Sequence, residues 1–127
     1  MKLNPDLIRD ILLTVEENTS LTKQMTYEPG SNFELLNNYS PDEVTYHIKQ
    51  CELSGFFYKV KWFTGLHQIP IIFYLTPAGH EFLSNIRSEQ NWSKTKSIAQ
   101  KVGSVSLDSI TKIATSVIAS VISSQFK

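Results

Sequence analysis

Hydrophobic positions near the N-terminus recur every three or four residues, which is the spacing of one face of a helix. The stripe follows Asn4-Pro5, runs to about Glu17, and consists of Leu7, Ile8, Ile11, Leu12 and Val15. Proline is favourable at the first helical position, because the N–H that it lacks has no helical partner there. We therefore predict a first helix with its apolar face in the core.

Residues 18–38 show no sustained hydrophobic period. The run Pro29-Gly30-Ser31-Asn32 has the composition of a turn. Met25 to Glu28 is predicted to form a short strand, and Phe33 to Leu36 a short helix. A clear scaffold helix is not expected between the first helix and Ser40.

A second helix is predicted to begin at Ser40, where Ser40, Pro41 and Glu43 form the pattern of a capping box. Its inward positions are Val44, Ile48 and Cys51. Gly55 supplies a left-handed stop, and we expect Leu53 and Phe56 to close the packing around it.

Two segments rich in aromatic and branched residues follow, at 56–63 and 69–75, with a loop-like run at 64–68 between them. This pattern predicts a β-hairpin. Thr76-Pro77 then opens a third helix, with Phe82, Leu83 and Ile86 facing inward. A helix closed by glycine, a hairpin and a further helix occur in this order in winged-helix domains.

The C-terminal part is predicted to hold two more helices. The first has an apolar side formed by Trp92, Ile98, Ala99 and Val102, and ends at Gly103. The last begins at Ser106 and carries a broad apolar stripe opposite Ser and Thr. The stripe consists of Leu107, Ile110, Ala114, Val117, Ile118, Val121 and Ile122.

Such a stripe requires burial, either against its own domain or against a second copy of the chain. We expect a homodimer formed through these seven residues, because two-fold pairs are the commonest oligomers. On this expectation, Val117→Asp or Val121→Asp gives a monomer or an insoluble protein. The polar face has too few basic residues for a membrane-surface helix.

These elements predict a mostly helical α+β fold, with a winged helix-turn-helix-like domain over residues 1–88 and a helical extension over 89–127. The length, 127 residues, suits one domain with an extension. A single cysteine, Cys51, excludes an internal disulfide. The first ten residues contain no apolar run typical of a signal peptide, and we expect a cytoplasmic protein without a membrane span.

The formal net charge is zero, so the whole molecule has no general attraction for nucleic acid. The charge is uneven: residues 1–38 carry three basic and six acidic side chains, whereas residues 88–127 carry five basic and two acidic. Basic surface is therefore local, with one lysine cluster at Lys94, Lys96 and Lys101.

If the helix after Ser40 is a recognition helix, it presents Thr45, Tyr46, Lys49 and Gln50 to base edges or phosphates. Lys59, Lys61 and His67 lie on the hairpin, where a wing contacts the DNA backbone. Asp42 and Glu43 argue against this interpretation, because they lie at the end of the helix that enters the DNA groove and would repel the phosphate backbone.

Enzymatic chemistry has little support, and no catalytic residue, cofactor or metal site is predicted. His47 and Cys51 stand four residues apart on one helix and could form a thiolate–imidazole pair. A buried structural cysteine is the commoner case, and no orienting carboxylate is evident. The three histidines do not have metal-ligand spacing.

Several motifs resemble the family named domain of unknown function 2513, found in Firmicutes and their phages. The matching residues are Tyr46-His47-Ile48, Ser54-Gly55-Phe56, Leu75 to Leu83, Ile86-Arg87, Trp92, Lys94-Thr95-Lys96 and Gly103 to Leu107. The resemblance implies a fold and a phage or mobile-element context more than an activity. The shorter Leu75-Thr76-Pro77-Ala78-Gly79 piece is similar to regulators of the multiple-antibiotic-resistance and phenolic-acid repressor kinds, which dimerise and bind DNA.

Two functions follow as alternatives. The first is a winged-helix DNA-binding transcriptional regulator that binds duplex DNA as a dimer. The second is a protein-interaction module, such as a phage-encoded modulator of a host protein complex, which uses the same scaffold without DNA. Tyr46, Tyr58 and Trp62 would suit this second use if they are exposed, because aromatic residues are enriched at protein contacts.

Overall fold

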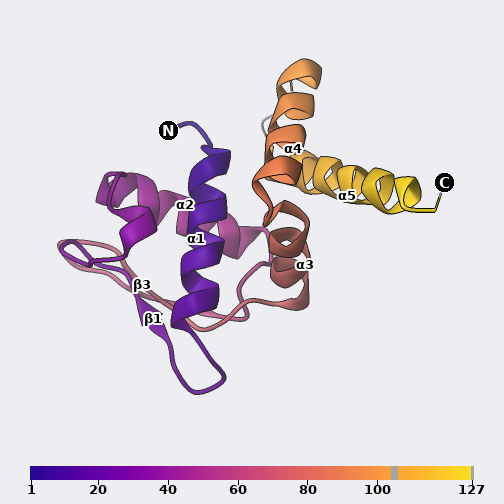
Figure 1. Cartoon of the computed structure of the whole chain (residues 1–127). Helices are drawn as coiled ribbons and strands as arrows, with labels where there is room; N and C mark the ends of the chain where they lie inside the picture. The colour runs from indigo at the N-terminus through magenta and orange to yellow at the C-terminus, as the bar shows by residue number, and fades with distance from the viewer. Residues whose placement is uncertain (104–105, 127) are drawn as a thin grey trace. The chain divides into compact units, whose positions relative to one another are not determined.

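A computed structural model describes residues 1–103 and 106–126. Residues 104, 105 and 127 lie outside the described residues, including the Ser104-Val105 part of the Gly103–Leu107 motif. The described chain is a mostly helical α+β protein with five α-helices and one three-stranded antiparallel sheet. Figure 1 shows these elements in chain order.

The chain divides into two compact units, residues 1–80 and residues 81–127. The division falls inside helix α3 (Pro77–Ile86), whose Phe82, Leu83 and Ile86 are buried as predicted. The expected domain limits, 1–88 and 89–127, stay a prediction.

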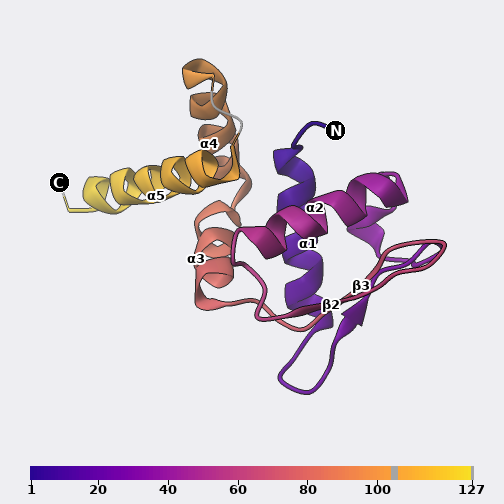
Figure 2. The same cartoon turned by 180° about the vertical axis from the view of Figure 1, so that it is seen from behind.

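In the first unit, helices α1 (Pro5–Asn18) and α2 (Pro41–Leu53) pack against each other. Both views show them crossing (Figures 1 and 2). Asn4 caps α1 by accepting from the N–H groups of Asp6 and Leu7. The predicted apolar face of α1 is buried in full, which confirms the periodicity.

Helix α2 begins with the predicted capping box, in which the Ser40 hydroxyl accepts from the Glu43 N–H at 3.2 Å. The helix stops at Gly55, whose φ of 78° lies in the left-handed region that favours glycine. Val44, Ile48 and Cys51 are buried. The prediction for Leu53 was wrong, since this residue is 70% exposed and Phe56 alone packs inward at the helix end.

The sheet has the strand order β1-β3-β2, with β1 at Met25–Thr26, β2 at Val60–Phe63 and β3 at Ile69–Ile72. The hairpin register pairs Val60 with Ile72 and Phe63 with Ile69. The strands are shorter than predicted, although one further bridge joins Phe57 and Leu75. A single 3₁₀ turn, η1 (Glu34–Leu36), precedes α2, close to the short helix expected there.

Helix α3 starts in close contact with the end of α2. The Thr76 hydroxyl donates to the Gly55 carbonyl oxygen at 2.6 Å and accepts from the Gly79 N–H at 3.1 Å. A Cβ on Gly79 would overlap the backbone oxygen of Phe56. The Leu-Thr-Pro-Ala-Gly motif therefore specifies a close approach of two backbones.

The second unit contains α4 (Glu89–Val102) and α5 (Leu107–Ser124), which pack against each other. Gly103 ends α4 with a φ of 70°. Trp92 and Ala99 are buried as predicted, together with Thr95. The prediction for Ile98 and Val102 was wrong: they are 40% and 64% exposed, because the buried face of α4 follows Trp92, Thr95 and Ala99. Across the described residues, no helix combines the length and apolarity needed to cross a membrane.

Candidate interaction groove between α2 and the hairpin

A groove of about 710 Å³ separates the exposed side of α2 from the β2–β3 hairpin. We call it the α2–hairpin groove. Helix α2 lines it with Asp42, Thr45, Tyr46 and Lys49. The hairpin lines it with Trp62, Leu66, His67 and Gln68.

Trp62 is held in place by two residues of α2. Its indole N–H donates to Glu52 Oε1 at 3.0 Å, and Lys49 Nζ lies 5.0 Å from the ring centroid. The same Glu52 oxygen accepts from Lys49 Nζ at 2.9 Å. The indole is therefore held by a carboxylate and an ammonium that also pair with each other, and it lines the groove.

Four of the predicted DNA contacts lie together in this groove: Thr45, Tyr46, Lys49 and His67. Gln50 lies on α2, is partly exposed, and is not among the groove residues. The role of these residues in DNA contact stays a prediction.

Lys59 and Lys61 lie elsewhere. Their Nζ atoms are 5.7 and 5.6 Å from the centroid of the Phe73 ring. Because side chains alternate along a strand, Lys61 points to the opposite face of the sheet from Trp62. The two lysines therefore do not share the groove with the α2 residues.

The charge on the exposed side of α2 is mostly negative. Asp42 and Glu43 occupy its first turn, and Lys49 is paired with Glu52. A negative first turn is favourable at the helix N-terminus but repels a phosphate backbone. The groove is consequently better suited to apolar or basic groups than to DNA phosphates.

Sequence reasoning missed Leu66, Met1 and Pro29 as groove residues. Leu66 is 94% exposed in the hairpin loop, and Tyr46, which also lines the groove, is 39% exposed. An isolated leucine within a polar loop, Thr64-Gly65-Leu66-His67-Gln68, was the available indication. Met1 and Pro29 become neighbours of α2 only through the fold.

His47 and Cys51 are both fully buried. His47 Nδ1 lies 2.7 Å from the Glu43 carbonyl oxygen, and Nε2 accepts from the Asn4 N–H at 2.8 Å. Burial raises the pKa of the Cys51 thiol well above its usual range. Both nitrogens of the imidazole therefore have backbone partners, and the thiol is held protonated, so neither residue is placed for nucleophilic chemistry.

Among the residues that the structure describes, no cluster of three or more His, Cys, Asp or Glu side chains could hold a metal ion.

The predicted dimer stripe on α5 divides into buried and partly exposed residues. Leu107, Ile110, Ala114 and Val117 are buried within a single chain. Ile118 and Val121 are partly exposed, and Ile122 is 53% exposed. The dimer prediction now depends on these last three residues.

Comparisons with known proteins agree with the motifs. A family model described as "Hypothetical protein (DUF2513)" matches residues 2–106. An "Uncharacterized protein" of Haemophilus influenzae (strain ATCC 51907 / DSM 11121 / KW20 / Rd) is 31% identical over 120 residues, covering 93% of this chain and 96% of the relative. No solved structure matches.

Proposed function

This chain belongs to the DUF2513 family, and from its surface we propose that it is a protein-interaction module. The family description assigns no activity. The proposed scaffold is a winged helix, in which α2 is the recognition helix and the β2–β3 hairpin is the wing. The element order and the strand order β1-β3-β2 support this assignment. The proposed contact surface is the α2–hairpin groove.

The observation that carries the proposal is the fixed orientation of Trp62. Rigid aromatic side chains are favoured as anchors at protein contacts, because they offer a large surface at low cost in conformational entropy. Glu52 and Lys49 fix the indole before a partner arrives. Tyr46 and Leu66 add exposed apolar surface to the same groove. We propose that the partner inserts an apolar or aromatic side chain beside Trp62.

A photo-crosslinking amino acid at position 66 tests this proposal in the full chain. In host cell extract, we expect it to crosslink a discrete protein, identified by mass spectrometry. Trp62→Ala with Tyr46→Ala should reduce the crosslink at least tenfold. The matched control is the same crosslinker at Leu35, which is 42% exposed but lies outside this groove. Equal products from positions 66 and 35, or no protein product, would contradict the proposal.

Duplex DNA binding by a transcriptional regulator is the second candidate. The observation that favours it is the pair Lys59 and Lys61, which lie side by side on the proposed wing. In that case Thr45, Tyr46, Lys49 and Gln50 would read bases, and the two lysines with His67 would contact phosphates. A phage or mobile-element origin is a further prediction that accompanies either function.

Fluorescence anisotropy of labelled mixed-sequence duplex DNA, titrated across a salt series, tests the second candidate. DNA contact predicts an affinity that falls linearly on a log–log salt plot. Lys59→Glu with Lys61→Glu should abolish it, whereas Lys112→Glu, a single reversal on α5, should leave the affinity within about threefold, since one phosphate contact at most is at stake. Absence of binding at low salt would exclude this candidate.

A further inference from the structure

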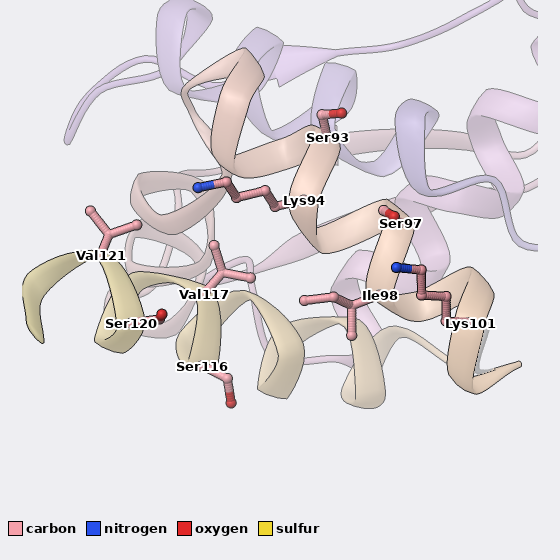
Figure 3. A pocket seen from close by; sticks show the side chains of 9 residues that line it. All are labelled: Ser93, Lys94, Ser97, Ile98, Lys101, Ser116, Val117, Ser120 and Val121. Atoms are coloured by element: carbon pink, nitrogen blue, oxygen red, sulfur yellow. The ribbon is translucent and has the colours of Figure 1, made fainter. Parts of the chain in front are cut away.

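A second groove, of about 490 Å³, lies within residues 81–127 between α4 and α5 (Figure 3). We call it the α4–α5 groove. Four of its lining residues have small polar side chains: Ser93 and Ser97 on α4, and Ser116 and Ser120 on α5. These small side chains leave open a volume that larger residues would fill.

The lining combines an apolar centre with two basic groups. Ile98 and Val121 supply the exposed apolar surface above the buried Val117, and Lys94 and Lys101 lie along α4 on either side of Ile98. Neither lysine forms an ion pair with any residue in the described ranges 1–103 and 106–126. Two ammonium groups therefore flank an apolar surface that is open to a partner.

The spacing of these groups matches the repeat of a helix. Lys94 and Lys101 are seven residues apart, which places them on one face of α4 about 10 Å apart along its axis. Ile98 lies on the same face, four residues after Lys94. A helical partner with carboxylates at positions i and i+7, and apolar side chains at i+3 and i+4, presents the complementary pattern over the same length.

We propose that the α4–α5 groove binds an acidic amphipathic helix of a partner protein. The carboxylates of this helix pair with Lys94 and Lys101, and its apolar side chains cover Ile98 and Val121. This site is separate from the α2–hairpin groove and does not depend on the function proposed for it.

A second copy of this chain does not fit the same chemistry. Residues 88–127 contain two acidic side chains, Glu89 and Asp108, and Asp108 is paired with Lys112 at 3.0 Å. The acidic helix α1 has its apolar face buried in its own unit, so it has no apolar surface to offer. Charge complementarity therefore favours a foreign partner. Phosphate groups of a nucleic acid would not cover the apolar centre.

The test uses the full chain and a fluorescein-labelled model helix with Glu at positions i and i+7 and Leu at i+3 and i+4. Fluorescence anisotropy should detect binding of this peptide. A matched peptide with Lys in place of both Glu should bind at least tenfold more weakly, because its charges repel Lys94 and Lys101.

Charge reversal on the protein identifies the site. Lys94→Glu with Lys101→Glu should weaken binding of the acidic peptide at least tenfold and strengthen binding of the basic peptide. Ser97→Leu, which fills the groove from an exposed position, should also weaken the acidic peptide. Lys112→Glu is the control and should change neither affinity by more than about threefold, as an exposed pair contributes little. Circular dichroism should show that all variants fold.

The proposal fails if the acidic peptide does not bind, or if the double reversal leaves its affinity unchanged. It also fails if light scattering shows a dimer that Ser97→Leu dissociates, because the groove then holds a second copy. Duplex DNA that displaces the peptide from the unmodified protein, and that no longer binds after the double reversal, would show that the groove binds nucleic acid instead.

Discussion

The imidazole of His47 joins the start of α1 to α2. Since the Glu43 carbonyl oxygen accepts, the nearby Nδ1 carries the proton, and this leaves Nε2 free to accept from the Asn4 N–H. Asn4 is also the residue that caps α1. A motif that suggested chemistry in the sequence is thus explained by a structural role in the fold.

His47→Leu should lower the free energy of unfolding by about 1–3 kcal/mol, because it leaves the partly buried N–H of Asn4 without its acceptor. Urea denaturation followed by circular dichroism measures the change. His67→Leu in the exposed hairpin loop is the control, with an expected change within about 0.5 kcal/mol. Equal effects of the two substitutions would remove the structural role assigned to His47.

Tyr39 is a second residue whose hydroxyl joins distant segments, since it donates to Asp10 Oδ2 at 2.9 Å. Burial and this hydrogen bond to the carboxylate raise its pKa from 10.0 to about 12. Between these values the unfolded chain loses the phenol proton while the folded chain keeps it. The stabilisation from Tyr39 is therefore complete below pH 10 and disappears as the pH rises to about 12.

Tyr39→Phe should consequently be less stable than the unmodified protein at pH 8, and this difference should shrink between pH 10 and 12. Chemical denaturation at a series of pH values measures it for both proteins. Other titratable groups contribute equally to both proteins, so they cancel in the difference in stability between Tyr39→Phe and the unmodified protein. A difference that stays constant up to pH 12 would contradict the assigned hydrogen bond.

At the scale of elements, the junction between α2 and α3 depends on Gly79, the point of closest backbone approach. Gly79→Ala gains about 1 kcal/mol of helix propensity at most. It also forces a methyl group against the Phe56 carbonyl oxygen, an overlap that costs about 1–3 kcal/mol or more. We expect a net loss of stability, measured by thermal unfolding.

Gly65→Ala is the matched control for Gly79→Ala. A Cβ at position 65 has no neighbour within 4 Å, so the substitution should change stability by about 0.5 kcal/mol or less. If Gly79→Ala proves as well tolerated as Gly65→Ala, the close approach of α3 to Phe56 is not a constraint on the fold.

For the whole molecule, the homodimer prediction concerns Ile118 and Ile122 on α5, which do not line the α4–α5 groove. Ile122 is 53% exposed, whereas Val117 is 5% exposed. The predicted dimer therefore implies that Ile122→Asp gives a folded monomer. Val117→Asp should instead unfold the chain, because it buries an unpaired charge.

Light scattering with circular dichroism separates these outcomes. Ser123→Asp adds the same charge one residue away from the apolar stripe and should leave the mass unchanged. A monomeric mass for the unmodified chain would rule out the dimer, and a folded, dimeric Ile122→Asp would move the interface away from α5.

The positions of the helices and the hairpin could be predicted from the amino-acid sequence. Caps such as Ser40 with Glu43, stops such as Gly55 and Gly103, and the three-to-four-residue repeat of α1 act between residues close in the chain. Local interactions of this kind can be predicted without the tertiary structure. They also fixed which face of α2 is buried.

Which side chains share a surface depends on the packing of distant segments and could not be predicted from the sequence. Packing of Trp62 against Glu52 sets the phase of β2, and strand alternation then directs Lys61, with Lys59, to Phe73 on the opposite face. A shift of one residue in the pairing of β2 would exchange the faces on which Trp62 and the two lysines lie. No local sequence pattern specifies this register. In the same way, packing of α4 on α5 buried Ala99 and left Ile98 beside the α4–α5 groove, because the contact between helices selects one of two neighbouring apolar residues.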